Sequence, residues 1–307
     1  MKISIVTPTY NEVSNIEKLC NEIKNQFTKI DCEYEHIVID NSSNDGTIEK
    51  LRQLAGSDKN LKVIINTKNF GHIKSPFHGL LQSSGDATIL MASDFQDPIE
   101  MIPKYIEKWK EGKKIVLGEK IKSEENFMKF FFRKMFYKFL NFISDLKLTI
   151  NTTGSGIFDR SVIEKLKKVQ DPYPYFRGLI SEIGYEISTI KFHQPIRLSG
   201  KTKNNFFTLY DIGMLGIVKH SRKPLRFMIL IGFILGLISL AAGLFYLIYK
   251  LLFWNSFSLG IAPVVVGIFF VSSVQIILLG LVGEYIGVIL IHARNMPMVI
   301  EKERINF

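Results

Sequence analysis

The sequence has few cysteines and lacks the common phosphate-binding motifs. Of its 307 residues only Cys20 and Cys32 are cysteines, and they form no CxxC pair, which excludes a disulfide-rich scaffold and gives no zinc site. There is no GxGxxG after the first apolar run and no GxxxxGKS or GxxxxGKT, which disfavours dinucleotide dehydrogenases and P-loop NTPases. The six histidines show no metal-ligand spacing. Because 47% of the chain is hydrophobic, a disordered chain is also excluded.

The amino terminus shows no secretory signal. Residues 1–12 lack the basic head and long apolar stretch of such a signal and are typical of a short strand followed by a polar turn. We therefore expect about the first 220 residues to stay in the compartment where they are made, with the two cysteines as reduced thiols in structural roles.

Charge is missing from two long stretches near the carboxyl terminus. Residues 227–249 and 257–283 contain no Asp, Glu, Lys, Arg or His, and each run exceeds the roughly 20 residues that cross a bilayer as a helix. The sequence thus predicts two membrane spans. Gly232 and Gly236, and likewise Gly283 and Gly287, have the GxxxG spacing that permits close helix approach, so a homo-oligomer through these helices is a candidate arrangement.

Positive charge is concentrated beside these runs. The chain carries a formal charge of +10, and residues 197–226 hold seven basic side chains against one aspartate, whereas the connection at 250–256 has only Lys250. By the positive-inside rule we expect an integral inner or plasma membrane protein with both termini in the cytoplasm and an external hairpin at 250–256. Residues 120–138 are also basic. Anionic membrane lipids and phosphate-bearing lipids explain this placement better than nucleic acid does.

Apolar runs of strand length alternate with amphipathic stretches over the first 120 residues or so. This alternation predicts βαβ units and an α/β fold with a mainly parallel sheet, of the nucleotide-binding type. In such sheets ligands bind beyond the carboxyl ends of the strands. Polar residues gather at four of those ends, in residues 7–12, 40–46, 66–71 and 93–97.

Several motifs occur in a recognisable order along the chain. They are TPTYNE (7–12), VIDNSSNDGT (38–47), NFGH (69–72), SDFQDP (93–98), FDR (158–160), YFRGLISEIG (175–184), RLSGKTKNNF (197–206) and GEYIG (283–287). In these motifs the chain resembles the family 2 glycosyltransferases of the GT-A fold, and more narrowly the polyprenyl-phosphate sugar transferases similar to dolichol-phosphate mannose synthase and bactoprenol glucosyltransferases.

The resemblance implies an activity and a division of the chain. The activity is inverting transfer of a sugar from a nucleotide sugar to polyprenyl phosphate at the cytoplasmic membrane face, for cell-surface glycan modification. We expect a GT-A domain over residues 1–202, a juxtamembrane amphipathic segment over 203–225, two transmembrane helices within 226–292 and a cytoplasmic tail over 293–307.

The resemblance also assigns a nucleotide-sugar site. Asp40, at the end of a strand, would accept hydrogen bonds from the nucleobase or ribose. Pro8, Tyr10 and Glu12 would form the opposite wall of the base pocket. The remaining contacts would come from the loop that contains Asn69 and Gly71.

A divalent cation, Mg²⁺ or Mn²⁺, is implied at the end of the fourth strand. Asp94 and Gln96 would supply oxygen ligands, with diphosphate and water completing the shell. Ala92 stands where the family has the first aspartate of its Asp-x-Asp. Asp97 and Pro98 are typical of a helix start, so Asp97 is interpreted as an N-cap outside the chemistry.

Basic side chains would bind the acceptor phosphate. The resemblance places Arg133 and Lys138 there, in residues 127–142, which as a helix would lie at a membrane surface or form a core helix with a solvated face. Arg197 and Lys201 could clamp donor or acceptor phosphate, and Arg177 is a weaker candidate. The catalytic residues expected are then Asp94, Arg133 and Lys201.

Two departures from the family leave alternatives open. Gly154 stands where the family carries an acid, so no general base is evident. A lipid monophosphate is already anionic and needs none, which favours a phosphate acceptor. A transferase acting on a lipid-linked sugar hydroxyl would need a base, for which Glu182 is the nearest candidate. A catalytically silent membrane scaffold is a third alternative, motivated by Ala92 and Gly154.

Overall fold

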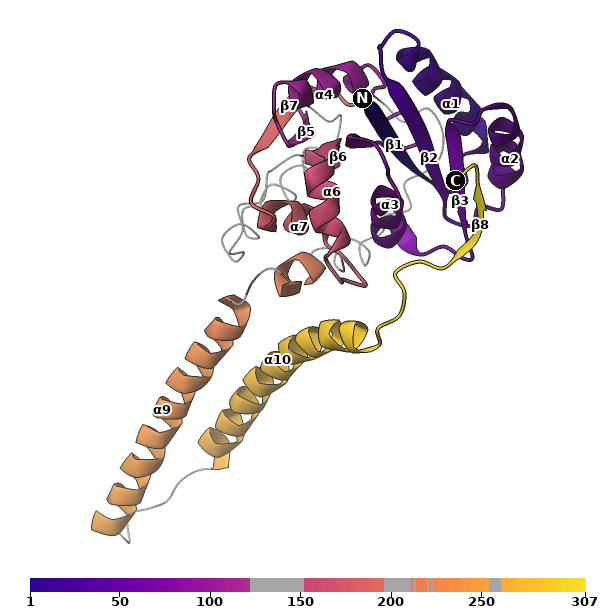
Figure 1. Cartoon of the computed structure of the whole chain (residues 1–307). Helices are drawn as coiled ribbons and strands as arrows, with labels where there is room; N and C mark the ends of the chain where they lie inside the picture. Colours follow the sequence, from indigo (N-terminus) through magenta and orange to yellow (C-terminus); the bar gives the residue numbers. More distant parts are fainter. Residues whose placement is uncertain (122–151, 196–210, 212–213, 220, 222, 254–260) are drawn as a thin grey trace.

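A single eight-stranded sheet forms the centre of the amino-terminal domain (Figure 1). The structure is a computed structural model and describes residues 1–121, 152–195, 211, 214–219, 221, 223–253 and 261–307. The strand order is β7-β5-β6-β4-β1-β2-β3-β8. The strands are β1 (Lys2–Thr9), β2 (Glu33–Asp40), β3 (Leu61–Asn66), β4 (Ala87–Leu90), β5 (Ile115–Lys120), β6 (Thr152–Asp159), β7 (Ile187–Phe192) and β8 (Glu301–Ile305).

Parallel pairing dominates the sheet. β3, β2, β1 and β4 are consecutive parallel neighbours, and β5 pairs with β7 in parallel, while β6 and β8 run antiparallel to their partners. The predicted α/β fold with a mainly parallel sheet is therefore confirmed.

Helices cover both faces of the sheet, which explains why the central strands are apolar on both faces. One face packs on α1 (Val13–Phe27), α2 (Thr47–Ser57) and α4 (Met101–Lys110), and the other packs on α3 (Gly71–Leu81), α6 (Arg160–Lys167) and α7 (Phe176–Glu182). Successive strand residues point to opposite faces, so Ile5 joins the first core and Val6 the second. Both are fully buried. A strand buried on both sides is therefore a nearly continuous apolar run, whereas a half-buried strand alternates apolar and polar residues.

Close backbone contact between β5 and β6 depends on a glycine. A Cβ on Gly156 would lie 2.2 Å from the carbonyl oxygen of Val116 and 2.9 Å from Cα of Leu117. Because both atoms are backbone, no side-chain rotation would relieve the clash. Gly156 therefore lets β6 approach β5 closely at this point.

Two long helices near the carboxyl-terminal end of the sequence extend away from the sheet domain (Figure 1). They are α9 (Lys223–Leu252) and α10 (Ile261–Ala293). Among the described residues, Phe270–Ala293 is long and apolar enough to cross a membrane, judged by length and composition. One membrane-compatible helix is thus found, and the second span remains a prediction. The predicted domain boundary at residue 202 lies outside the described residues.

The carboxyl-terminal tail returns to the sheet, which the sequence did not predict. β8 pairs antiparallel with β3 and forms one edge of the sheet. In Figure 1 the tail runs from the end of α10 back to the domain and ends beside β3. The predicted tail segment therefore contributes a strand to the sheet.

Candidate active site

The carboxyl ends of four strands lie together, as predicted. β3, β2, β1 and β4 are parallel neighbours, so the turns that follow them share one edge of the sheet. The turn after β1 is joined to the turn after β2, because the backbone N–H of Asn11 donates to Ser43 Oγ at 2.8 Å and that of Asn44 donates to Asn11 Oδ1 at 3.0 Å. Asn11 adopts a left-handed backbone conformation (φ 57°) that asparagine tolerates better than most residues.

Asp40 is buried at the centre of this edge. Its carboxylate accepts hydrogen bonds from the backbone N–H of Ser43 at 2.8 Å and from Ser43 Oγ at 2.5 Å. Burial raises the pKa of Asp40, although the bonds from Ser43 oppose the rise. A carboxylate has about four lone-pair positions, so capacity remains for a further donor such as a nucleobase N–H or a ribose hydroxyl.

Asn41 organises the loop after β3. Its Oδ1 accepts from Asn66 Nδ2 at 3.1 Å and from the backbone N–H of Phe70 at 2.8 Å. Its Nδ2 donates to Asn69 Oδ1 at 2.8 Å and to the carbonyl of Gly71 at 3.2 Å. The predicted nucleotide-binding residues Asn69 and Gly71 are therefore brought to Asp40 through its neighbour in the sequence. Asn41 itself was not among the predicted site residues; an amide directly after a strand-end aspartate was the available signal.

The other predicted wall residues follow β1. Pro8 belongs to the strand, while Tyr10 and Glu12 lie in the turn, and all three side chains are half-buried. The backbone N–H of Glu12 donates to Thr47 Oγ1 at 3.0 Å, and its carboxylate accepts from Asn15 Nδ2 at 2.6 Å. Glu12 thus also positions the start of α1.

Two buried polar atoms near this edge have no partner among the described residues. They are Thr9 Oγ1, at the end of β1, and Asn66 Oδ1, at the end of β3. Leaving a buried polar atom unpaired costs about 1–3 kcal/mol, and such atoms are rare in native structures. Both belong to strand ends that flank Asp40.

Asp94 and Gln96 lie in one tight turn after β4. Asp94 Oδ1 accepts from the backbone N–H of Gln96 at 3.2 Å, and Phe95 between them has a left-handed backbone (φ 59°). Carboxylate and carboxamide oxygens are ligands that suit Mg²⁺ or Mn²⁺. No group of three His, Cys, Asp or Glu side chains that could hold a metal occurs in the described part of the chain. Asp94 and Gln96 could thus supply two of the oxygen ligands of such a cation.

Asp97 does not cap a helix, contrary to the sequence interpretation. α4 begins at Met101, with Glu100 at the N-cap position. Asp97 is instead 6% exposed, and its Oδ2 accepts from Ser155 Oγ at 2.5 Å and from the backbone N–H of Ala92 at 3.2 Å. Burial raises the pKa of Asp97, against the effect of these two bonds. Pro98 leads into a turn here, so Asp97 ties the loop of Asp94 and Gln96 to β6.

The predicted acceptor-binding residues Arg133, Lys138, Arg197 and Lys201 lie outside the described residues. Gly154, where the family carries an acid, has a left-handed backbone (φ 85°), and a Cβ there would lie 3.9 Å from Arg177 Nε. The weaker candidate Arg177 is thereby placed beside β6, close to the position of the missing acid. Glu182 is the last residue of α7.

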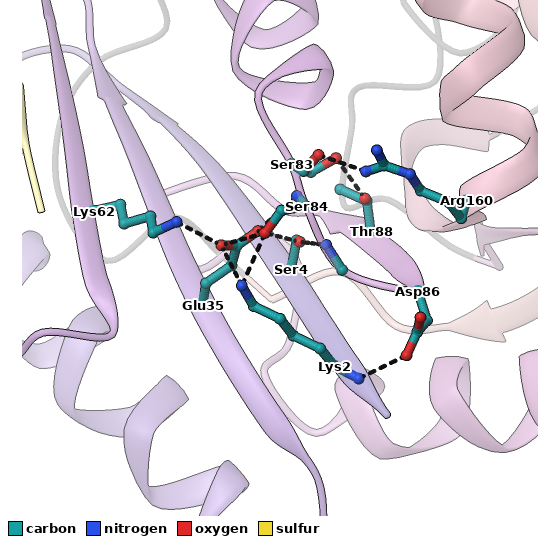
Figure 2. Close-up of polar contacts among 10 residues, drawn as sticks. Lys2, Ser4, Glu35, Lys62, Ser83, Ser84, Asp86, Thr88 and Arg160 are labelled. Carbon is teal, nitrogen blue, oxygen red and sulfur yellow. Dashed lines mark hydrogen bonds and ion pairs between the residues drawn. The ribbon is translucent and has the colours of Figure 1, made fainter. Parts of the chain in front are cut away.

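A second polar cluster lies at the amino ends of the same strands and serves structure (Figure 2). Its centre is Glu35, which accepts from Lys2, Lys62, Ser4 and Ser84. The FDR motif also has a structural role. Asp159 caps α6 by accepting from the backbone N–H of Ser161 at 3.0 Å, and Arg160 donates to the carbonyl of Ser83 at 2.8 Å.

Comparison with known proteins agrees with this architecture. Residues 4–167 match glycosyl transferase family 2. The SfII prophage-derived bactoprenol glucosyl transferase of Shigella flexneri is 34% identical over 99% of this chain and 98% of its own length. An uncharacterized glycosyltransferase of Synechocystis sp. is 32% identical over 97% of this chain and 94% of its own length.

Solved structures show the same fold. The glucosyl-3-phosphoglycerate synthase of Mycobacterium tuberculosis, in complex with Mn²⁺, UDP and phosphoglyceric acid, superposes with a TM-score of 0.50 at 18% identity, covering 71% of this chain and 76% of that one. The α/β domain described above therefore has the GT-A fold. On its sequence match and full-length relatives, the chain belongs to glycosyl transferase family 2.

Proposed function

We propose that this glycosyltransferase moves a sugar from a nucleotide sugar to polyprenyl phosphate at the cytoplasmic face of the membrane. The observation that carries the proposal is the full-length similarity to a protein named bactoprenol glucosyl transferase, at 34% identity. Similarity over 99% of the chain includes the apolar helices as well as the catalytic domain. A lipid acceptor lies in the membrane, so an enzyme that uses it would need such helices to reach it.

The character of α9 and α10 supports a membrane location. Ile229 on α9 and Ile277 on α10 are both 71% exposed, and many other large apolar side chains on the two helices are exposed as well. Exposed apolar surface of this extent is unfavourable in water and favourable in lipid. We propose that both helices span the bilayer, with the sheet domain on the cytoplasmic side as the distribution of basic residues indicates.

The proposed chemistry is a displacement at the anomeric carbon of the donor sugar. An oxygen of the lipid phosphate forms a new bond to that carbon from the face opposite the leaving group. The bond from carbon to the diphosphate oxygen breaks, and its electron pair leaves with the nucleoside diphosphate, so the anomeric configuration inverts. The attacking phosphate oxygen is already anionic, which agrees with Gly154 in the place of an acid.

The turn after β4 would hold the divalent cation in this proposal. Asp94 and Gln96 would be its protein ligands, and the cation would neutralise charge on the departing diphosphate. Asp40 and the loop of Asn69 and Gly71 would bind the nucleoside. The Mycobacterium tuberculosis synthase, which shares the fold, was solved with Mn²⁺ and UDP.

The proposal is tested with the purified full-length protein. It is incubated with polyprenyl phosphate, Mg²⁺ or Mn²⁺ and a panel of nucleotide sugars, while nucleoside diphosphate release and lipid mass are measured. We expect a mass gain of one sugar that requires the lipid phosphate.

Asp94→Asn and a matched control sharpen the test. We expect Asp94→Asn to lower the rate by more than about 100-fold, because even residues that only support a metal ligand cost roughly 10–100-fold when mutated. Asp31→Asn changes an exposed aspartate in the turn before β2, at the amino ends of the strands and away from the candidate active site. This variant should leave the rate unchanged. No transfer to lipid across the panel, together with no nucleotide binding, would contradict the proposal and favour a silent scaffold.

A further inference from the structure

The carboxyl-terminal tail contacts the domain from Met298 onwards. This C-terminal strap (residues 298–306) begins with Met298, which packs against the core on the α3 face, and Val299, which is 7% exposed. β8 then pairs with β3, with Ile65 opposite Glu303 and Asn66 opposite Glu301. The strap thus lies along the strand whose last residue, Asn66, belongs to the candidate active site.

The strap contacts both the start of the loop 67–71 and the helix α3 that follows it. The carbonyl of Ile300 accepts from the backbone N–H of Thr67 at 3.0 Å and from Thr67 Oγ1 at 3.1 Å. Beyond the loop, His78 Nε2 on α3 lies 2.5 Å from Glu301 Oε1, and both side chains are only 18% exposed. Two consecutive residues of the strap therefore contact the first residue of the loop and the helix that follows the loop.

A β-bulge directs Glu301 towards α3. The pairing shifts between Ile65 and Asn66, so that one extra strap residue, Lys302, is inserted between Glu301 and Glu303. Residues two apart on a regular strand share a face, whereas a bulge re-aims the side chains on either side of it. Glu301 contacts α3, and Glu303 contacts Arg52 of α2 at 2.7 Å, although α2 and α3 cover opposite faces of the sheet.

The same loop is held from within the domain by Asn41, through the bonds to Phe70, Asn69 and Gly71 described above. Its tip is otherwise open, since Lys68 and Asn69 are exposed. Ordering the backbone of one free residue costs about 1–2 kcal/mol. If the loop is already ordered before the ligand arrives, this cost does not reduce the free energy of binding.

We propose that the strap preorganises the loop 67–71 for donor binding, with Ile300 and Glu301 as positioning residues that act through Thr67 and His78. This inference rests on the proposed function in taking the loop as part of the nucleotide-sugar site. The segment that follows the second apolar helix would thus influence donor binding indirectly, through the loop, without contacting the donor.

The chain offers a matched pair of variants for the test. Glu301→Gln removes the charge that faces His78 and Arg304. Glu303→Gln, on the same strand, removes the charge that faces Arg52 of α2. Thr67→Val is a second probe of the loop, because it deletes only the side-chain bond to Ile300. All three are made in the full-length protein and compared by thermal unfolding, by hydrogen exchange of residues 66–71, and by the dissociation constants of UDP and GDP with Mn²⁺.

We expect Glu301→Gln and Thr67→Val to speed exchange at residues 66–71 and to weaken binding of the nucleotide that the wild type binds, by about fivefold or more for Glu301→Gln. The apparent affinity falls in proportion to the fraction of molecules whose loop is ordered. Glu303→Gln should leave both quantities within about twofold of wild type, and the KM for the lipid acceptor should stay unchanged in all three variants.

Two outcomes would overturn the inference. One is unchanged loop exchange and nucleotide affinity in both Glu301→Gln and Thr67→Val. The other is an equal loss in Glu303→Gln, which would show that the strap acts only as a general tether. If the wild type binds neither nucleotide, the proposed function loses its support, and the exchange comparison between Glu301→Gln and Glu303→Gln still decides the role of the strap.

Discussion

Replacing Glu35 by glutamine should destabilise the folded domain strongly although the residue is remote from the active site. The Glu35 side chain is 2% exposed and lies between two ammonium groups, Lys62 Nζ at 2.8 Å and Lys2 Nζ at 2.9 Å (Figure 2). Ser4 Oγ donates at 2.6 Å and the backbone N–H of Ser84 at 2.7 Å. Four segments, β1, β2, β3 and the turn before β4, therefore meet at one carboxylate.

The size of the expected destabilisation follows from the pKa of Glu35. Burial alone would raise this pKa, but the hydrogen bonds from Lys62, Ser4 and Lys2 outweigh it and lower the pKa from 4.5 to about 2. At about 1.4 kcal/mol per pKa unit, the ionised carboxylate stabilises the folded state by about 3 kcal/mol. Because the folded pKa is depressed, this stability is fully present above pH 4.5 or so and is lost as the pH falls towards about 2.

The assay is unfolding of wild type and Glu35→Gln at neutral and at low pH. For a domain of this size about 3 kcal/mol corresponds to a midpoint lower by roughly 6–12 °C at pH 7, and the gap should narrow between about pH 4.5 and pH 2. Glu33→Gln, on the same strand but exposed, should change the midpoint little. Equal midpoints for Glu35→Gln and wild type at pH 7 would refute the reasoning, as would a gap that does not narrow in acid.

Two further predictions concern packing around β6. Gly156→Ala should cost at least about 2 kcal/mol in thermal unfolding, because its Cβ would meet backbone atoms of β5, whereas Gly56→Ala in α2, with open space around its Cβ, should be neutral or slightly stabilising. Ser155→Ala should cost about 1–3 kcal/mol in the same measurement by removing a donor from the buried carboxylate of Asp97, and Ser57→Ala, at the exposed end of α2, should cost less. Each prediction would be contradicted if the β6 variant and its control in α2 lowered the stability by the same amount.

The fold could be predicted from the sequence because the signal is repeated in the strands of the first 120 residues. Ile5 and Val6 point into different cores, as do Ile64 and Ile65 on β3, so these strands are apolar on both faces. Alternation of such runs with amphipathic stretches allows few arrangements other than a parallel sheet with helices on both faces. The convergence of Asp40 with Asn69 and Gly71 followed from that topology alone.

The finer features of the site depend on contacts between distant segments, which the sequence does not display. Asp97 and Pro98 fit a helix start locally, and only the position of Ser155, on a strand far along the chain, shows that the carboxylate holds a loop instead. Asn41 likewise gained its role from Phe70 and Gly71, which lie in the next turn of the sheet. Polar side chains at strand ends serve several purposes, and the neighbouring strand decides among them.

The strap escaped prediction for a different reason. The segment EKERI has alternating charges and no apolar periodicity, as expected of a polar tail after a membrane helix. It forms a strand because β3 offers an unpaired edge. Strands at the edge of a sheet commonly carry charged side chains. Its burial pattern alternates between half-buried and exposed, so little apolar area was needed to select it. Pairing of this kind is determined by the partner strand.

The contacts of Asp171 show how firmly the sheet domain is joined to the long helices. Asp171 accepts from Lys219 Nζ at 2.5 Å, just before α9, and lies 3.3 Å from His292 Nε2 at the end of α10. One carboxylate therefore meets the chain where it enters and where it leaves the helix pair. A domain held at one point alone could rotate about it, but the strap adds a second attachment along the β3 edge. Two separated attachments oppose that rotation, so the carboxyl ends of β1–β4 keep a defined orientation towards the helices, which is the arrangement that the proposed transfer to a lipid acceptor would need.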